Sequence, residues 1–359
     1  MSAKRNSSKP KGKTKGRQTN GTHVRRAFDW IVNEGIFTKV KLHGNVKWSA
    51  ASLVCLAIFW VWSEESSLVQ AAVDAVDKAM SLFGFAAVQS YQALTGALRT
   101  YTGQLLPVMW ARLHSLMEEH GKNAFRVGRW LPLAVDGSRL LVPRTAGNEE
   151  RFCKPSKKRS KKRKKRGRHA KGKPMRRGPK KSHYAPQAVG PQMWLTLFWH
   201  IGLHLPWCWQ IGPSYSSERG HLLELIREHS YPKGTLFCCD AGFVGYDFWQ
   251  DIAAHGHHFL VRVGGNVRLL KKLGYVREGK DIVYCWPDEA MKKKQPPLVL
   301  RLLQFSDRRG IVYLITNVLH QEDLTHAQAS KIYRGRWGIE ISLPDRRSSQ
   351  RLYLTRIAA

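Results

Sequence analysis

The sequence predicts an α/β protein that follows a helical region and carries a β-rich insertion. Three observations lead to this prediction. Residues 236–263 contain two short apolar runs separated by apolar residues at helical spacing, which is typical of a strand–helix–strand unit. In residues 24–125 the apolar residues recur mostly at steps of three and four, which is typical of packed helices. Residues 264–322 hold short apolar runs between polar turns, which favours strands.

The charge balance of the chain indicates a polyanionic partner. The 359 residues include 60 Lys and Arg against 26 Asp and Glu, a formal net charge of +34, although 43% of the residues are hydrophobic. A positive field of this size attracts nucleic acid in the first place, and an anionic membrane surface is the weaker alternative. The apolar run 50–62 is shorter than the ~20 residues that span a bilayer, so we interpret it as a buried helix of a soluble protein.

Cysteine usage favours a reducing compartment. The chain contains 6 Cys, without any Cys-x-x-Cys spacing, and most of them lie in apolar runs. We therefore expect buried free thiols and neither disulfides nor a zinc site.

The N-terminal part divides into two regions. Residues 1–23 are rich in Lys, Gly and Ser and nearly free of apolar residues, so we expect a disordered basic arm. Residues 24–125 predict an all-α domain, whose clearest helix follows Ser63. Such a domain can contain a DNA-reading helix-turn-helix or can be a plain helical bundle, and the sequence does not separate the two interpretations.

Two aspartates follow short apolar runs in the region 126–263. Asp136 follows the run 130–135 and is itself followed by Gly137, and an Asp-Gly pair between two apolar runs is a strong signal for a hairpin turn. Asp240 follows the run 236–239 at the point where α/β sheets tend to place their chemistry, although it can also merely cap the next turn. The functional interpretation is that the two carboxylates meet on neighbouring strands.

Between the two aspartates lies an almost wholly cationic segment. Residues 154–181 consist nearly entirely of Lys, Arg, Gly and Pro, so we expect an extended loop between strands. Its charge density suits the release of counterions from DNA phosphates, without any reading of base sequence, and a solvated linker is the alternative. The densest part of this loop is formed by Lys161, Lys162, Arg163, Lys164, Lys165 and Arg166.

A final helix is expected within residues 323–359. Thr325 to Gln328 form a capping-box pattern, which marks the start of a helix. Tyr333, Arg336 and Glu340 follow at spacings of three and four and therefore share one helix face. An acid next to an Arg on a helix is more often an ion pair than a catalyst.

The order of the three acids is more informative than any one of them. A strand meander carries Asp136, a strand–helix unit carries Asp240, and a helix after a β insertion carries Glu340. This is the layout of a ribonuclease H-like core. The chain also resembles the Asp-Asp-Glu (DDE) transposases of bacterial insertion sequences, of the insertion-sequence-four type. Three segments carry the resemblance, namely AVDGS at 134–138, CDAGF at 239–243 with Gly256 and Arg262 downstream, and YRGRWGIE at 333–340.

The resemblance implies an enzyme that cleaves DNA and transfers strands of an insertion sequence. It implies that Asp136, Asp240 and Glu340 are catalytic and hold two Mg²⁺ or Mn²⁺ ions, which suit hard oxygen ligands. The DNA contacts it implies are Tyr333, Arg336, Arg347 and Arg262, to which we add the basic loop. The expected partner is double-stranded DNA at the element ends and the target, bound by a homodimer. Neither a membrane nor a small-molecule substrate is expected, and the location is the bacterial cytoplasm, at the nucleoid.

The resemblance to the family stops after Glu340. Pro344 is expected to end the helix early, and Arg347 stands where the family has a lysine. The remaining tail has no helical periodicity, as in a truncated or frameshifted copy, so we expect impaired catalysis. The alternative to a transposase is therefore a non-enzymatic, basic nucleic-acid-binding protein, such as a defective transposase remnant.

Overall fold

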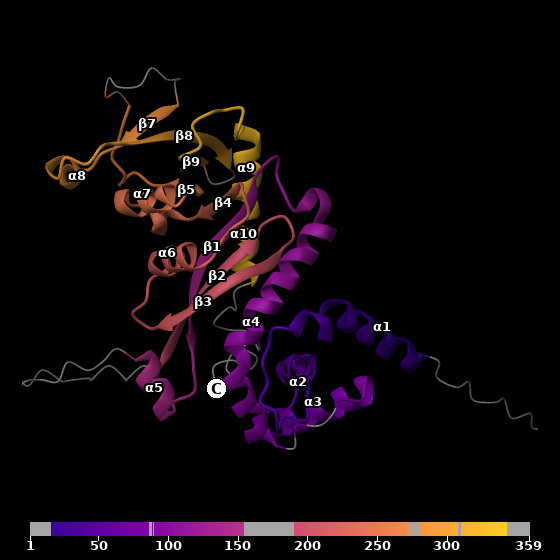
Figure 1. Cartoon of the computed structure of the whole chain (residues 1–359). Helices are drawn as coiled ribbons and strands as arrows, with labels where there is room; N and C mark the ends of the chain where they lie inside the picture. The colour runs from indigo at the N-terminus through magenta and orange to yellow at the C-terminus, as the bar shows by residue number, and fades with distance from the viewer. Residues whose placement is uncertain are drawn as a thin grey trace, which may run out of the picture. The chain divides into compact units, whose positions relative to one another are not determined.

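The computed structural model describes residues 16–85, 88, 90–153, 190–271, 273, 281–307 and 310–342. The chain divides into two compact units, residues 1–122 and residues 123–359. In Figure 1 the first unit is coloured from indigo to purple and the second from magenta to yellow.

All elements described in the first unit are helical. They are α1 (Gly16–Ile31), the short 3₁₀ helix η1 (Glu34–Phe37), α2 (Ala50–Trp62), α3 (Leu68–Phe83) and α4 (Tyr91–Gly121). The uncharged helix α2 forms the centre of the core, where Leu53, Leu56 and Phe59 are buried among residues of the other helices. Its bounds are those of the apolar run in the sequence, and its first turn is held by a capping box of Ser49 and Ser52.

Two further observations concern the expectations for this unit. Helix α1 begins at Gly16, so the described end of the expected disordered arm is helical. Among the residues that the structure describes, no helix combines the length and the apolar character needed to cross a membrane.

The second unit is built on one mixed sheet. Its strands are β1 (Leu131–Leu141), β2 (Gln192–His200), β3 (Leu205–Pro213), β4 (Thr235–Cys239), β5 (His258–Val263), β6 (Leu269–Leu270), β7 (Ile282–Cys285), β8 (Leu298–Asp307) and β9 (Gly310–Thr316). Over the described residues their order is β3-β2-β1-β4-β5-β9-β8-β7-β6. Figure 1 labels each of these strands except β6. Strands β1, β4 and β5 run parallel to one another, and the remaining neighbours are antiparallel.

The first strand passes straight through Asp136 and Gly137. Strand β1 pairs with β2 from Leu133 to Leu141, with Asp136 opposite Leu197 and Gly137 opposite Thr196. The hairpin turn suggested by the Asp-Gly pair is therefore wrong. Pairing with the aromatic-rich strand β2 outweighs the local turn preference, because a strand is stabilised mainly by its cross-strand neighbours.

The strands of the expected insertion join the same sheet. Strand β9 pairs with β5 in antiparallel orientation, with Val261 opposite Ile315, and β8 and β7 extend the sheet beyond it. The apolar runs of the insertion predict strands but not their partner, because pairing across long sequence distances leaves no local signal.

Helices cover both faces of this sheet. The second unit contains α5 (Ala146–Phe152), α6 (Glu218–Glu228), α7 (Tyr246–Ala254), α8 (Asp288–Lys292), α9 (His326–Gly335) and α10 (Trp337–Ser342), with short 3₁₀ turns η2 (Lys122–Ala124) and η3 (Ala241–Phe243). Leu236 and Cys238 pack with α9 and α10 in one core cluster. Side chains alternate between the two faces along a strand. On the face opposite to Leu236 and Cys238, Phe259 of β5 stacks against Trp249 of α7, with ring centroids 5.8 Å apart.

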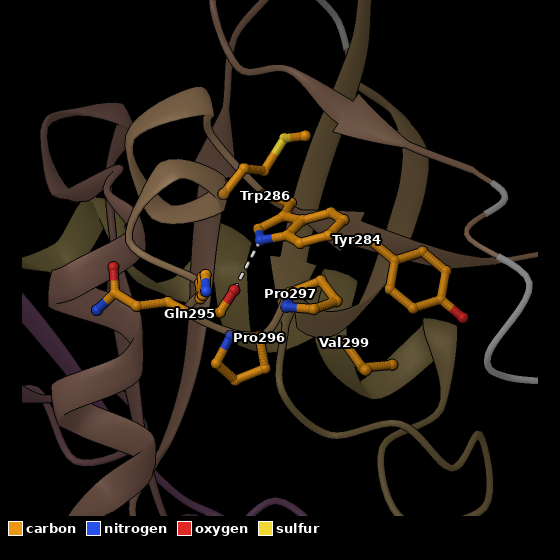
Figure 2. A pocket seen from close by; sticks show the side chains of 8 residues that line it. Tyr284, Trp286, Gln295, Pro296, Pro297 and Val299 are labelled. Atoms are coloured by element: carbon orange, nitrogen blue, oxygen red, sulfur yellow. Dashed lines mark hydrogen bonds between the residues drawn. The ribbon is translucent and has the colours of Figure 1, made fainter.

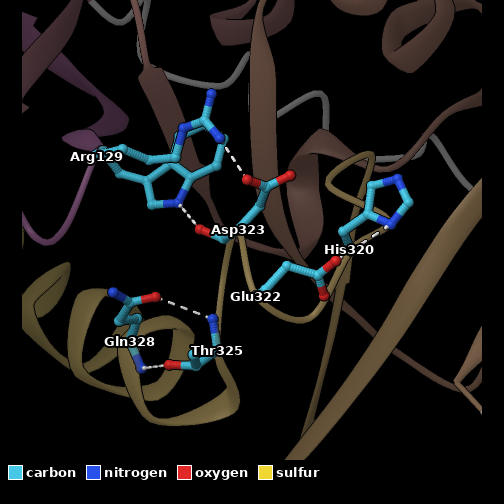
Figure 3. A network of polar contacts seen from close by, with 7 residues as sticks. Arg129, His320, Glu322, Asp323, Thr325 and Gln328 are labelled. Atoms are coloured by element: carbon cyan, nitrogen blue, oxygen red, sulfur yellow. Dashed lines mark hydrogen bonds and ion pairs between the residues drawn. The ribbon is translucent and has the colours of Figure 1, made fainter.

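The start of α9 is firmly anchored. Thr325 and Gln328 form the reciprocal capping box that the sequence predicts, with hydrogen bonds of 3.2 and 2.9 Å. Just before it, Arg129 pairs with Asp323, and the Trp130 indole N–H donates to the Asp323 carbonyl at 2.6 Å. Figure 3 shows both contacts, which tie the segment leading into α9 to the start of β1.

Candidate active site

Asp136 lies in β1, and Asp240 directly follows β4, the parallel strand beside it. The pairing of β1 with β4 ends at Ala134 opposite Cys238, and each aspartate lies two residues beyond this pair. Burial raises the pKa of Asp136, and the negative charges of Asp240 and Glu340 act in the same direction. The neighbouring Arg336 guanidinium and the Gly137 N–H oppose this rise. The structure therefore places Asp240 and Glu340 close enough to Asp136 for their charges to act on it.

Each aspartate uses one carboxylate oxygen in its own loop. The Gly137 N–H donates to Asp136 Oδ1 at 2.9 Å, and the Gly242 N–H donates to Asp240 Oδ1 at 2.7 Å. Asp240 therefore does cap the turn that follows it, and this structural role coexists with a place in the acidic cluster. Within the described part of the chain, the second oxygen of either carboxylate accepts no hydrogen bond.

Glu340 is held in an ion pair. Arg336 Nη2 lies 2.8 Å from Glu340 Oε1, and the Arg336 side chain is only 5% exposed. The guanidinium carbon also lies 5.6 Å from the centre of the Tyr333 ring and 5.4 Å from that of Trp337. The ion-pair interpretation of Glu340 is thus what the structure displays.

The expected single helix is divided at Arg336. Helix α9 ends at Gly335 and α10 begins at Trp337. The Arg336 N–H donates to the Tyr333 carbonyl, and the Ile339 N–H donates to the Arg336 carbonyl, so both bonds span three residues instead of four. This tight turn places Arg336 against Glu340. Arg336 Nε and Nη1 are buried and make no hydrogen bond of good geometry to any described residue.

Close packing through two glycines holds this segment against the sheet. A Cβ atom at Gly335 would lie 2.4 Å from Ile201 Cγ2, and one at Gly338 would lie 3.0 Å from His204 Nδ1. Side chains at these positions would therefore push α9 and α10 away from the turn that follows β2.

Gly335→Ala should lower the free energy of unfolding by about 1–3 kcal/mol, because overpacking forces such a helix to shift. Urea unfolding followed by tryptophan fluorescence measures the loss. Gly147→Ala in α5 is the matched control, since a Cβ atom there meets nothing within 4 Å. Equal stability of Gly335→Ala and the wild type would contradict the packing described here.

The remaining predicted DNA contacts divide into two groups. Arg262 of β5 lies near Tyr333, since its positive charge acts to lower the pKa of the Tyr333 hydroxyl, which burial raises overall. The second group comprises Arg347 and the loop residues Lys161, Lys162, Arg163, Lys164, Lys165 and Arg166. Like Pro344 and the tail, they lie outside the described residues, so the expectations for them stay predictions.

Sequence reasoning missed one acidic residue, Glu218. It opens α6, where Ser217 is the N-cap, and the sequence offers only this helix-start signal. Burial, followed by the charges of Asp136 and Asp240, raises the pKa of Glu218 to about 7. A Cβ atom at Gly137 would lie 2.5 Å from Glu218 Cγ, so the side chain rests directly on β1 at Gly137.

The raised pKa predicts a pH-dependent stability. Because the pKa of Glu218 in the folded state, about 7, exceeds its ordinary value of 4.5, the folded state favours the protonated form. The stability contributed by this proton is complete below pH 4.5 and is lost as the pH rises through about 7. In metal-free buffer at pH 8, Glu218→Gln should therefore be more stable than the wild type by about 2 kcal/mol, and the gap should narrow toward pH 5.

Urea titrations at both pH values measure this gap. Glu228→Gln, at the exposed end of the same helix, serves as the control and should show no such dependence. A gap that stays constant with pH would contradict the assignment.

The carboxylates fit the chemistry of a hard divalent cation without forming a finished metal site. Among the described residues, no group of three or more His, Cys, Asp and Glu side chains is arranged so that it could hold a metal ion. The donors gathered around Asp136 are nevertheless carboxylate oxygens, which Mg²⁺ and Mn²⁺ prefer.

A separate pocket lies in the region of the inserted strands. It has a volume of about 630 Å³ and is lined by Tyr284, Trp286, Met291, Lys294, Gln295, Pro296, Pro297 and Val299. The Trp286 indole N–H donates to the Gln295 carbonyl at 2.8 Å, which fixes the ring at the pocket wall (Figure 2). None of the predicted site residues lines this pocket.

Comparison with known proteins identifies a related domain. Residues 208–347 match the model of the family described as transposase DDE domain. This stretch includes Asp240 and Glu340 and begins after Asp136. The match supports a transposase of the DDE type.

Two further comparisons add less. No curated protein matches the chain. A solved structure of piggyBac transposase, in a synaptic complex with hairpin DNA, is similar with a TM-score of 0.39 and 11% sequence identity. The similarity covers 88% of this chain, which spans 66% of the length of that transposase.

Proposed function

We propose that this chain is a DNA transposase of the insertion-sequence-four type, which cleaves DNA and transfers strands with the help of divalent metal ions. The observation that carries the proposal is that Asp136 in β1 and Asp240 at the end of the adjacent parallel strand β4 lie at the same level of the sheet, where the charges of Asp240, Arg336 and Glu340 act on Asp136. The family match over residues 208–347 supports it. The bacterial source and the location at the nucleoid rest on the resemblance alone.

The topology supports a ribonuclease H-like core for this activity. In the order β3-β2-β1-β4-β5, β1 has an antiparallel neighbour on one side and a parallel neighbour on the other. This arrangement gives β1 the central position and leaves Asp136 beyond the last residue pair with β4. In open α/β sheets, ligands bind outside the carboxyl ends of the parallel strands, where Asp240 also lies.

The residues of this site would bind either the metal ions or the DNA phosphates. Asp136 and Asp240 would hold the cations through their free carboxylate oxygens, and Glu340 would join them on release from Arg336. Bound Mg²⁺ would lower the pKa of the attacking water or 3′-hydroxyl and stabilise the leaving oxygen. Arg336 would then present its fork of donors to a DNA phosphate, a geometry that guanidinium groups favour. Tyr333 and Arg262 would hold the adjoining backbone.

A plasmid that carries the coding element with its flanking DNA tests the proposal. The purified full chain should nick or cut this plasmid at the element ends in Mg²⁺ or Mn²⁺, and EDTA should stop the reaction. Tight DNA binding without cleavage in either metal would contradict the proposal. That outcome would instead support the alternative function, a non-enzymatic binder of nucleic acid.

The basic loop should supply affinity that does not depend on base sequence. Replacing residues 154–181 by a Gly/Ser segment of equal length should flatten the plot of log affinity against log salt, by about 0.9 for each phosphate that the loop no longer neutralises. Fluorescence anisotropy with a labelled duplex measures this slope. A variant with the native slope, or one that loses sequence preference but keeps its overall affinity, would argue against this role.

A further inference from the structure

Helix α3 of the first unit buries small side chains and exposes large ones. Its buried face consists of four alanines, at positions 71, 72, 75 and 79. Val69, Val73 and Met80 lie on another face and are 53%, 47% and 51% exposed. A surface helix usually turns its larger apolar side chains toward the core. Together with the partly buried Val76, these three residues form an apolar stripe, the outer ridge of α3, and exposed apolar surface of this kind marks sites of interaction.

The outer ridge belongs to a helix with well-defined ends. At its start the Ser67 hydroxyl accepts from the Gln70 N–H at 3.4 Å. At its end the Gly84 N–H donates to the Met80 carbonyl at 2.9 Å, with Gly84 in the left-handed conformation at a φ of 69°. The ridge residues are therefore placed relative to one another by regular helix geometry.

The spacing of the outer ridge makes it complementary to a second copy of itself. Its residues follow one another at steps of four, three and four, a pattern that keeps apolar side chains facing a neighbouring helix. The pattern is the same when it is followed from either end. In an antiparallel pair with its two-fold axis between Val73 and Val76, Val69 would face the partner's Met80, and Val73 would face the partner's Val76. Every side chain of the ridge would thereby meet another apolar side chain.

A hollow next to the ridge offers space for the partner's side chains. It has a volume of about 280 Å³, and its wall includes Val73 and Val76 of the ridge together with Val88, Tyr91 and Leu94. Since the partner's Val76 would face Val73 across the two-fold axis, that side chain would lie at the hollow. Each copy has both the ridge and the hollow, so the same contact would occur twice, as in an isologous dimer.

The charges around the ridge favour a protein over DNA as its partner. Residues 62–80 contain four Asp and Glu side chains and only one basic residue, Lys78, which pairs with Asp74 at 2.6 Å. This segment is therefore acidic in a chain whose net charge is +34. Acidic side chains repel DNA phosphates. An apolar stripe without a cationic border instead suits a partner that presents apolar side chains, as α3 of a second copy does.

We propose that two copies of this chain associate through α3, with their outer ridges packed antiparallel about a two-fold axis. The inference gives the expected homodimer a contact surface in the first unit, whereas the candidate active site belongs to the second. It goes beyond the proposed function and does not depend on it.

Sedimentation velocity of the full chain tests the association. Nuclease treatment and high salt keep nucleic acid from bridging the copies. The wild type should sediment as a dimer, and Val73→Glu should raise the Kd of this dimer by about 100-fold or more, because each copy brings a new negative charge into an apolar contact. Leu113→Glu, at another exposed apolar position of the same unit, is the matched control and should leave the Kd unchanged.

Met80→Lys repeats the test outside the hollow, because Met80 does not line it. It should raise the Kd of the dimer by about tenfold or more, since two new charges again enter the contact. Val73 and Met80 are both about half exposed, so both variants should fold. Near-ultraviolet circular dichroism checks that each variant keeps the spectrum of the wild type.

Disulfide cross-linking tests the antiparallel arrangement. A mixture of the Val69→Cys and Met80→Cys proteins should form a covalent dimer on mild oxidation. Either protein alone should not exceed the background of the wild type, whose Cys153 is only partly buried. In the antiparallel pair, two copies of position 69 would be about 16 Å apart along the helix axis, which is too far for a disulfide.

The outcomes separate this inference from the proposed function. A monomeric wild type, a dimer that Val73→Glu leaves intact, or cross-links that form within one variant but not in the mixture would each overturn the inference and leave the transposase proposal intact. Dimerisation that depends on the outer ridge, in a chain that cuts no DNA, supports the inference and contradicts the proposed function.

Discussion

Asp136→Asn and Asp240→Asn should each abolish DNA cleavage, with a loss of about 10³-fold or more. Each change removes a carboxylate that would bind the metal ions. The loss of a metal ligand costs several kcal/mol of transition-state stabilisation. DNA binding should stay close to that of the wild type, because neither aspartate contributes positive charge. Cleavage of the element-bearing plasmid and anisotropy with labelled DNA measure the two effects separately.

Asp247→Asn is the matched control for these variants. Asp247 lies exposed near the start of α7, close in sequence to Asp240 but outside the acidic cluster. It should cleave like the wild type. If Asp136→Asn retained cleavage while remaining folded, Asp136 would have no catalytic role.

Arg336→Ala should lose both cleavage and stability. It leaves Glu340 without its partner at 2.8 Å and removes the guanidinium that lies over the Tyr333 ring and over the Trp337 ring. Removing one member of a buried ion pair typically costs about 3–5 kcal/mol, and the exposure of Glu340 places the expected loss near 3 kcal/mol. Urea unfolding gives this loss, and the plasmid assay gives the loss of cleavage.

Two variants separate the roles of Arg336. Arg336→Lys keeps the charge but not the planar fork, so it should recover part of the stability and little of the cleavage. Arg334→Ala, an exposed neighbour whose Nη2 donates to the Ser306 carbonyl at 3.1 Å, should change either quantity only slightly. Full activity of Arg336→Lys would show that charge alone is required.

Local sequence patterns predict most helices and strands of the second unit, but not how all of them pair and pack. The capping box at Thr325 and Gln328 is present, and α6 begins after Ser217 as the sequence indicates. The Asp136-Gly137 pair shows where such reasoning fails, since the turn it suggests is absent from β1. Turn chemistry is a preference of a few residues, whereas pairing with β2 along most of the strand is a sum over many cross-strand pairs.

For a similar reason, the sequence predicts only part of the candidate site. Asp136 and Asp240 each follow an apolar run, which is a local signal, and their positions on adjacent strands follow from the parallel pairing of β1 with β4. Glu218 carries no local signal beyond a helix start, and its place next to Gly137 depends on how α6 packs across the sheet. The division of the last helix at Arg336 likewise results from packing, through the glycines that flank it.

The location of bound Mn²⁺ tests the central claim most directly. Crystals of the full chain soaked in Mn²⁺ give anomalous scattering that identifies the metal without reference to activity. We predict an anomalous peak within ligand distance of carboxylate oxygens of both Asp136 and Asp240. Peaks confined to other parts of the molecule, at saturating Mn²⁺ concentrations, would contradict the claim that these two aspartates form the metal site.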